Sequence, residues 1–249
     1  MIDVNYCKAV AVVRLDRGVI NALNLEVVQE LAEILERVRV MPKVQALILS
    51  STNEKFFSIG FDIPQLFELP KEDFRKFYKA FNQACMALYT LPKPTIACIT
   101  GHAIAGGCIL ALCCDYRVIG AGRKLMGLNE IKLGVPAPYV ADCILQSIVG
   151  TREAREVVEL GEFYEAEVLL KKGLVDEVVP QAVVMERARE KAELLSLMPP
   201  EAYRRIKENR IEEVEARIRA RWEERQQDFI EMWYSEEARK RLREAMERF

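Results

Sequence analysis

The sequence predicts an α/β fold with one large core, followed by a helical C-terminal region. Three β-rich runs are each followed by segments with helical apolar spacing, an alternation typical of α/β domains. A chain of 249 residues with 51% apolar content can bury such a core. Beyond Pro199-Pro200 the composition changes to charged helical sequence. We therefore expect a core over residues 1–198 and a helical region over 199–249.

The first elements follow from apolar patterning and from residues that begin or end helices. The β-rich run 8–16 predicts a strand, and Asn24 is expected to cap the helix that follows it. The next expected elements are a strand at 44–50, a helix at 71–91 and a strand at 95–100. Leu91-Pro92 stops the second helix because proline lacks the N–H that a helix interior requires.

Glycines and a capping serine mark the later helices. Helices are expected at 137–149, 151–159 and 164–172, ending near Gly150, Gly161 and Gly173, before a late strand at 175–179. Apolar residues at helical spacing then form a stripe among charges: Ile211, Val214, Ile218, Trp222, Phe229, Ile230 and Trp233. We expect this stripe to pack on the core or on a neighbouring subunit. Ser235 is expected to cap one more helix.

Composition and charge argue against several kinds of partner. A net charge of −2 provides no long-range field for nucleic acid or anionic lipid. No apolar segment approaches about 18 residues, and the start of the chain lacks a signal-peptide pattern. We therefore expect a cytoplasmic protein with a small-molecule partner, and neither nucleic acid nor membrane.

The cysteines and the single histidine argue against a metal site. Seven cysteines show no C-x-x-C spacing and most have apolar neighbours, so buried free thiols are expected. His102 is the only histidine, which disfavours a site of His and Cys ligands. A lone histidine at a strand end is typical of a hydrogen-bonded structural residue, so we expect no catalytic role for it.

Two adjacent glycines, Gly106 and Gly107, follow the strand at 95–100 and begin an apolar helix in AIAGGCILALCCDYRVIG, residues 103–120. The first N–H groups of a helix are unpaired and lie at the positive end of its dipole, so they favour negative charge. The segment lacks the glycine spacing of nucleotide-binding loops, which makes a developing enolate oxygen a candidate occupant. The alternative is that the glycines only permit close packing. Asp115 and Arg117 are expected to end this helix together and to hold the chain geometry.

A second small-residue turn, SIGFDI at 58–63, follows another strand. Phe61 comes directly after Gly60, and Asp62 is placed to cap a short helix. Backbone N–H groups from this turn and from the Gly106 turn would then serve one ligand oxygen.

Together with NALN at 21–24 and GLNEIKLGVPAP at 127–138, these two segments make the chain resemble the enoyl-CoA hydratase/isomerase family, also called the crotonase family. The resemblance covers nearly the whole chain, with four motifs in the family's order and separation. It implies a crotonase-like spiral of β-β-α turns and a C-terminal region that forms trimers or paired trimers. It also implies an acyl-CoA thioester as substrate, with coenzyme A present only as part of that substrate.

Matching residue by residue, the resemblance implies that the N–H groups of Phe61 and Gly106 hold the thioester oxygen. Further substrate contacts are implied for Ile59, Gly60 and Ile109, with Lys55 or Arg17 at the phosphates. Phe61 is bulkier than the alanine common in the family, which would shorten or reshape the acyl pocket.

The reaction depends on the carboxylates. Family members that hydrate a double bond carry two glutamates, and here the first position is Ile109 while the second matches Glu130. Moving a double bond needs one proton shuttle and no bound water. The motifs most resemble the family's Δ3,Δ2-enoyl-CoA isomerases, which implies Glu130 as the catalytic base. A hydratase or another thioester reaction, and a non-catalytic acyl-CoA or RNA-binding protein, remain the alternatives.

Overall fold

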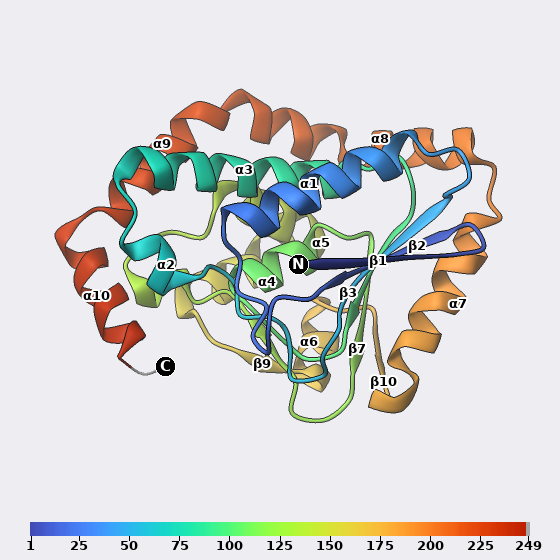
Figure 1. The fold of residues 1–249 in the computed structure, drawn as a ribbon, viewed down its shortest axis with the longest axis horizontal. Helices are drawn as coiled ribbons and strands as arrows, with labels where there is room; N and C mark the ends of the chain where they lie inside the picture. The colour runs from blue at the N-terminus through green and yellow to red at the C-terminus, as the bar shows by residue number, and fades with distance from the viewer. Residues whose placement is uncertain (248–249) are drawn as a thin grey trace.

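The computed structural model describes residues 1–247 and contains two β-sheets wrapped by helices (Figure 1). The six-stranded sheet has the order β1-β2-β3-β5-β7-β10, and the four-stranded sheet has the order β4-β6-β8-β9. The strands are β1 (Ile2–Cys7), β2 (Val10–Leu15), β3 (Ala46–Ser51), β4 (Phe56–Ser58), β5 (Thr95–Ile99), β6 (His102–Ile104), β7 (Tyr116–Gly120), β8 (Leu125–Gly127), β9 (Tyr164–Glu165) and β10 (Glu177–Val179).

The helices follow the strands in a regular way that makes the core a spiral. The α-helices are α1 (Leu25–Val40), α2 (Ile63–Phe67), α3 (Lys71–Tyr89), α4 (Gly106–Leu112), α5 (Tyr139–Leu160), α6 (Ala166–Lys172), α7 (Val184–Ser196), α8 (Pro200–Ala220), α9 (Trp222–Trp233) and α10 (Glu236–Met246). Short 3₁₀ helices are η1 (Glu130–Leu133) and η2 (Gln181–Val183). Each successive pair of strands, β3-β4, β5-β6 and β7-β8, places one strand in each sheet before helical structure follows. This is the predicted β-β-α spiral.

Capping residues begin helices where the sequence predicts. Val27 N–H donates to Asn24 Oδ1 (3.1 Å) at α1, and Gln65 N–H donates to Asp62 Oδ1 (3.3 Å) at α2. Ala238 N–H donates to Ser235 Oγ (3.2 Å) at α10. Each side-chain oxygen satisfies an N–H that the helix itself leaves unpaired.

The structure adds five strands that the sequence analysis did not predict, β1, β6, β7, β8 and β9, and it merges two predicted helices. The edge strand β1 pairs antiparallel with β2, and its partly exposed residues alternate apolar and polar, so the sequence shows no apolar run there. The helices predicted at 137–149 and 151–159 form one stretch, α5, that is interrupted at Gly150. Gly150 has φ 78° and ψ 161°, a conformation that glycine adopts without a Cβ clash.

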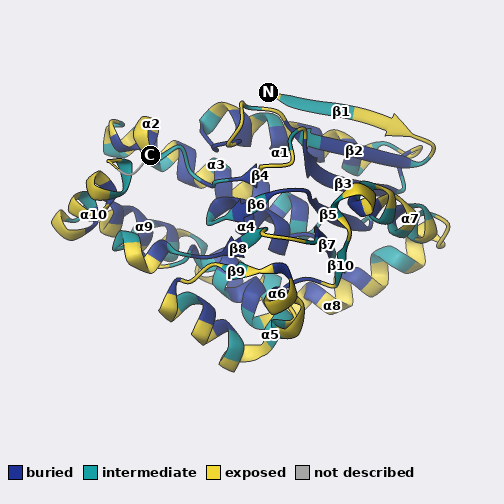
Figure 2. Ribbon diagram, turned by 90° about the horizontal axis from the view of Figure 1, so that it is seen from below, coloured by how far each residue is buried: buried dark blue, intermediate teal, exposed yellow. Residues whose placement is uncertain are grey.

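The C-terminal aromatic stripe packs on the core through α9, which lies along α3 in Figure 1. Phe229 stacks on Tyr78 with ring centroids 4.2 Å apart, and Trp233 stacks on Phe74 at 4.5 Å. Figure 2 shows buried strands at the centre and exposed positions on the outer helices. The prediction of packing on the core is confirmed for this helix.

Asp115 ties α8 to the core, as the predicted structural role requires. Its carboxylate accepts from the Thr95 N–H (2.9 Å) and from Lys207 Nζ (2.8 Å), and it also pairs with Arg210. Arg117 instead pairs with Asp176 (3.3 Å). The two residues therefore hold different parts of the chain. The prediction that they end a helix together is wrong, because α4 ends at Leu112 and Arg117 lies in β7.

Six of the seven cysteines are buried and Cys7 is exposed, and all seven are free thiols. This agrees with the predicted use of cysteine as a small core residue. Among the helices of residues 1–247, none is long and apolar enough to cross a membrane.

Candidate active site

Two glycine-containing turns meet at one edge of the four-stranded sheet. Strands β4 and β6 are parallel neighbours, so the turns that follow them, at 59–62 and 105–106, leave the sheet at the same edge. A Cβ on Gly60 would lie 2.7 Å from Gly106 N, and a Cβ on Gly107 would lie 2.3 Å from Ser58 O. Glycine is therefore required at both positions for the turns to pack. The packing alternative covers Gly106 and Gly107 together, and a Cβ on Gly106 would be less crowded, with its nearest atoms at 3.2 Å.

Each turn also leaves one backbone N–H unpaired. Around Phe61, Leu23 N–H donates to Gly60 O (2.7 Å) and Asp62 N–H donates to Leu23 O (2.9 Å). Within the described part of the chain, the N–H groups of Phe61 and Gly106 donate to no protein acceptor. Both residues line the same cavity, so a packing role for the glycines does not exclude the predicted ligand-binding role.

Ala105, directly before Gly106, has φ 47° and ψ −115°. A side chain makes this region of backbone conformation unfavourable, and such strain persists only where the surrounding structure enforces it. Ala105 N–H donates to Gly127 O (2.9 Å) and Ala105 O accepts from Ile109 N–H (2.9 Å), which hold the residue on both sides. The strain lies at the position that orients the Gly106 N–H.

The cavity has a volume of about 360 Å³ and a mostly apolar wall. This size is within the range of pockets that bind small molecules. Its wall includes Ile59, Phe61 and Gly106 from the two turns, Glu130 from η1, and Phe229 and Trp233 from α9. Segments from distant parts of the sequence thus converge on the unpaired N–H groups.

Glu130 is a buried carboxyl in this wall. The residue is 7% exposed, and its Oε2 has no hydrogen-bond partner in residues 1–247. Burial raises the pKa of Glu130 to about 7, because water no longer solvates the charged form. A carboxyl that titrates near neutrality can both accept and return a proton.

Asp62 is the other acid of the cavity wall, and it is already engaged. Its Oδ2 pairs with Arg17 Nη1 (2.7 Å) and its Oδ1 caps α2. Arg17 also donates to Ala22 O (2.9 Å). Arg17 therefore braces the Phe61 turn, a contact that the sequence did not reveal.

Ile109 and Lys55 are the remaining residues that the sequence predicts to contact substrate, and one is buried while the other is exposed. Ile109 is 1% exposed and belongs to the core, and it is not one of the described residues that line the cavity. Lys55 is exposed beside Phe56, with Nζ 5.8 Å from the centre of that ring, and Phe56 lines the cavity. Both predicted cations therefore lie beside the cavity wall, Lys55 next to Phe56 and Arg17 paired with Asp62.

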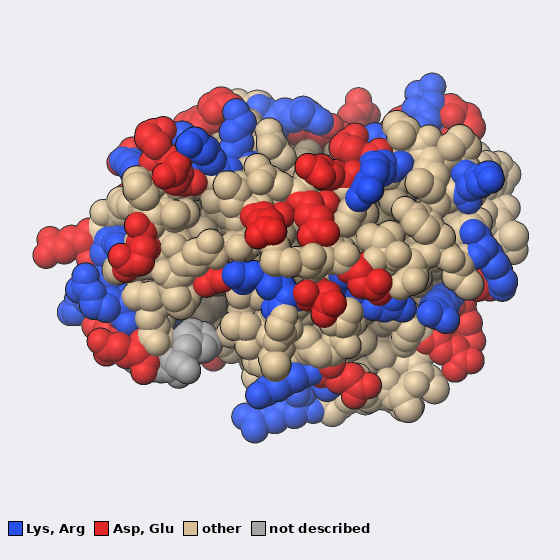
Figure 3. All heavy atoms as spheres, in the orientation of Figure 1, with Lys and Arg blue, Asp and Glu red and all other residues tan. Residues whose placement is uncertain are grey.

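Arg123 and Lys124 are basic residues near Lys55 that the sequence did not single out. Lys124 Nζ donates to Glu54 O (2.9 Å), which joins the β7-β8 loop to the β3-β4 loop. In Figure 3 basic side chains gather at the lower edge, where Figure 1 places the β7-β8 loop. The dipeptide Arg-Lys just before β8 was the only sequence signal.

His102 has the predicted structural role. Its Nδ1 accepts from Leu125 N–H (2.9 Å), which joins β6 to β8. Burial, with the nearby charges of Lys124, Arg123 and Lys55, lowers the pKa of His102. The imidazole is therefore neutral at neutral pH.

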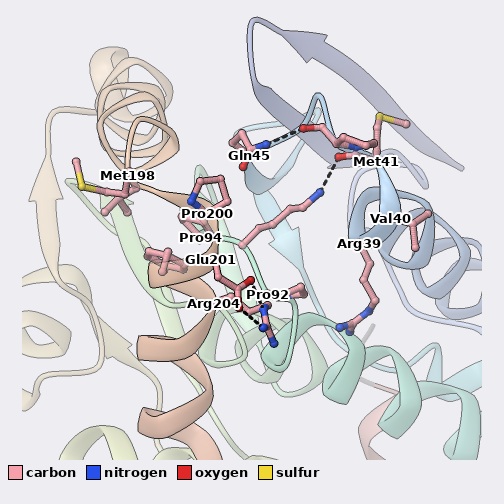
Figure 4. Close-up of a pocket in the computed structure, with 14 residues that line it drawn as sticks. Arg39, Val40, Met41, Gln45, Pro92, Pro94, Met198, Pro200, Glu201 and Arg204 are labelled. Carbon is pink, nitrogen blue, oxygen red and sulfur yellow. Dashed lines mark hydrogen bonds and ion pairs between the residues drawn. The ribbon is translucent and has the colours of Figure 1, made fainter.

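A second hollow of about 260 Å³ lies between the end of α1 and the start of α8 (Figure 4). Its polar groups bond to one another: Lys93 Nζ donates to Met41 O (2.8 Å) and Gln45 Nε2 donates to Pro42 O (2.6 Å). Arg204 Nε donates to Glu201 (3.0 Å). No unpaired buried side-chain atom of residues 1–247 belongs to this hollow, unlike the cavity at Glu130.

Known proteins are similar to this chain in sequence and in fold. The family model for enoyl-CoA hydratase/isomerase matches residues 6–249. Mitochondrial enoyl-CoA delta isomerase 1 of Mus musculus is 35% identical over 72% of this chain, and the match spans 63% of that protein's length. A short-chain-enoyl-CoA hydratase of Clostridium acetobutylicum is 31% identical over 80% of this chain and 76% of its own length.

The fold agrees with a solved structure over nearly its full length. The crystal structure of human mitochondrial delta3-delta2-enoyl-CoA isomerase superposes with a TM-score of 0.96 at 28% identity, covering 99% of this chain and 97% of that chain. Because the family model matches almost the whole chain and two relatives exceed 30% identity, this chain belongs to the enoyl-CoA hydratase/isomerase family.

Proposed function

We propose that this protein is an isomerase that converts 3-enoyl-CoA thioesters to 2-enoyl-CoA thioesters. The observation that carries the proposal is one unpartnered buried carboxyl, Glu130, in the same apolar cavity as the unpaired N–H groups of Phe61 and Gly106. One base beside a site that stabilises an oxyanion is what a proton shift next to a thioester requires.

In this mechanism the thioester oxygen accepts hydrogen bonds from the Phe61 and Gly106 N–H groups. The Glu130 carboxylate removes a proton from C2, and the electron pair moves onto the thioester oxygen as a dienolate. Glu130 then returns the proton to C4, which leaves the double bond between C2 and C3. The two N–H groups act most strongly when the oxygen carries charge, so they lower the barrier rather than only binding substrate.

Hydration of 2-enoyl-CoA is the second candidate, because one relative is a hydratase at 31% identity. Hydration requires a group that positions water in addition to the base. Asp62 is committed to Arg17 and to the α2 cap, and the position matched to the first hydratase glutamate is Ile109. These residues favour isomerisation.

A substrate panel separates the candidates. Purified protein is incubated with 3-enoyl, 2-enoyl and 3,5-dienoyl thioesters of coenzyme A, and products are separated by liquid chromatography. We expect rapid double-bond transfer in the 3-enoyl substrate and weak or absent hydration of the 2-enoyl substrate. Hydration at a rate comparable with isomerisation would reverse the assignment.

We also propose that the protein requires no cofactor besides the coenzyme A of the substrate. Residues 199–249 are proposed to form a homotrimer, or a hexamer of paired trimers, in the cytoplasm. Light scattering of the purified protein measures the assembly, and a mass of one chain would contradict it.

A further inference from the structure

The peptide unit that carries the Phe61 N–H is held by a distant part of the chain, residues 17–24. Leu23 forms an isolated parallel bridge with Phe61, in which Leu23 N–H donates to Gly60 O (2.7 Å) and Asp62 N–H donates to Leu23 O (2.9 Å). Gly60 C=O and Phe61 N–H belong to one planar trans peptide unit and point in opposite directions. The bond from Leu23 therefore fixes the direction in which the Phe61 N–H points into the cavity.

The Arg17 guanidinium joins the same two segments beside this bridge. Its Nη1 donates to Ala22 O (2.9 Å), in the residue before Leu23, and lies 2.7 Å from Asp62 Oδ2, in the residue after Phe61. A guanidinium presents five N–H donors in a planar fork, so one side chain can hold a carbonyl and a carboxylate together. Arg17 thus connects the chain neighbours of both residues of the bridge.

Asp62 places a negative charge in the cavity wall, one residue from the Phe61 N–H. Its side chain is 17% exposed, so water screens this charge only in part. On the proposed function, negative charge develops on a thioester oxygen held by the Phe61 N–H. An uncompensated carboxylate there would oppose the charged transition state more than the neutral substrate. The Arg17 guanidinium supplies the compensating charge.

We propose that Arg17 is a positioning residue for the oxyanion-binding turn and acts through Asp62. Its guanidinium keeps the Phe61 peptide unit in place, and it neutralises the Asp62 carboxylate beside the developing dienolate oxygen. This inference rests on the proposed function for the placement of that oxygen. Arg17 takes no part in proton transfer. The family resemblance implies a different role for Arg17, contact with the phosphates of coenzyme A, and the two roles give different results on mutation.

The test compares variants that change the charge of Arg17, of Asp62 or of both. Arg17→Met removes the charge and the fork, whereas Arg17→Lys keeps the charge. Asp62→Asn removes the carboxylate charge but keeps an oxygen that can cap α2, and a double variant combines Arg17→Met with Asp62→Asn. The matched control is Arg14→Met, which breaks the Arg14–Asp3 ion pair (2.9 Å) between β1 and β2. Neither Arg14 nor Asp3 is among the described residues that line the cavity.

Steady-state turnover of 3-enoyl-CoA and calorimetric binding of a saturated acyl-CoA and of free coenzyme A are measured for each folded variant. Arg17→Met should lower kcat about 10- to 100-fold, because the oxyanion donor shifts and the Asp62 charge is exposed to the site. Its affinity for the saturated acyl-CoA should change by about twofold at most, since this ligand develops no charge. Arg17→Lys should retain more activity than Arg17→Met.

The double variant should recover part of the kcat that Arg17→Met loses, because no uncompensated carboxylate then lies beside the oxyanion. A double variant that recovers nothing would overturn the inference, since Arg17 would then not act through the Asp62 charge. An Arg17→Met kcat equal to that of Arg14→Met would also overturn it. Weaker binding of free coenzyme A at unchanged kcat would overturn it as well and would place Arg17 at the phosphates.

A second measurement needs no turnover and uses Arg17→Lys if Arg17→Met fails to fold. Infrared difference spectra are recorded for a bound saturated acyl-CoA that carries carbon-13 at the thioester carbonyl. Hydrogen-bond donors polarise a carbonyl and lower its stretching frequency, so the native protein should shift this band to lower frequency. The Arg17 variant should return the band toward the position of the free thioester, and Arg14→Met should not.

The infrared result separates failure of this inference from failure of the proposed function. A native band at lower frequency that the folded Arg17 variant leaves unchanged would overturn the role of Arg17 and leave the oxyanion-binding site in place. A native band at the position of the free thioester would overturn both, because no donor would then hold the thioester oxygen.

Discussion

Glu130 and Asp115 are both buried carboxyls, yet their surroundings differ in almost every other respect. Glu130 lines an apolar cavity and has an unpaired oxygen, while the Asp115 side chain, 4% exposed, is surrounded by Lys207, Arg210 and Thr95. Burial raises the pKa of Glu130 to about 7. Burial opposes ionisation of Asp115 as well, but the charges of Lys207 and Arg210 outweigh it and lower the pKa of Asp115.

The partners of these two buried carboxyls, more than their burial, set the direction in which each pKa is shifted. A carboxyl held by cations stays ionised and connects elements, as Asp115 connects α8 to the core. A buried carboxyl without partners has a raised pKa, which suits it to exchange protons near neutral pH.

Glu130→Gln should abolish most turnover. The amide cannot accept the C2 proton, so isomerisation should fall by about 10²- to 10⁴-fold while acyl-CoA binding stays nearly unchanged. Steady-state rates with 3-enoyl-CoA and calorimetric binding measure the two quantities. The control is Glu54→Gln, which changes an exposed acid. Near-native turnover in Glu130→Gln would exclude this residue as the base.

Gly106→Pro should slow the reaction by about 10²- to 10³-fold, because proline removes the N–H donor that holds the developing oxyanion. The control is Gly106→Ala, which keeps the N–H and whose Cβ would meet Gly60 and Phe61 at 3.2 Å. Circular dichroism checks that both variants fold. If folded Gly106→Pro retains native turnover, the glycine serves packing alone.

Asp115→Asn should destabilise the fold by about 3–5 kcal/mol, because it leaves the buried Lys207 ammonium without its anionic partner. Activity per folded molecule should remain unchanged, since Asp115 does not line the cavity. Urea unfolding measures the stability and the isomerase assay measures the activity. Loss of activity at full stability would show that Asp115 acts on the site.

The contributions of Glu130 and Asp115 to the free energy of unfolding should change with pH in opposite directions. Below a pH of about 7, Glu130 is protonated, so kcat/KM should fall about tenfold per pH unit. The raised pKa also means that the folded state binds more protons between pH 4.5 and about 7, so the contribution of Glu130 to stability decreases as pH rises through this window. Asp115, with its lowered pKa, contributes stability above its ordinary value of 3.8 that is lost at lower pH.

Unfolding free energies of the native protein and of Glu130→Gln, measured between pH 4 and 8, test this smallest effect. As pH rises from 4.5 to about 7, the unfolding free energy of the native protein should decrease relative to that of Glu130→Gln. A constant difference would show that Glu130 has an ordinary pKa.

The sequence by itself determined the local features of this protein. Apolar periodicity located most helices and strands, and the caps at Asn24, Asp62 and Ser235 are local because a side chain satisfies N–H groups a few residues away. The glycine turns and Glu130 were identified through motifs whose order along the chain resembles that of a family. Most of the spiral fold could thus be predicted without coordinates.

Only the tertiary structure decided which distant groups meet. Pairing of β4 with β6 brings the Phe61 turn to Gly106, and the Arg17 side chain pairs with Asp62. Ile109 belongs to the core, whereas Trp233 reaches the cavity because α9 folds back against α3. Periodicity shows that a residue is buried but not against what, because its neighbours across the core come from segments whose packing depends on the whole chain.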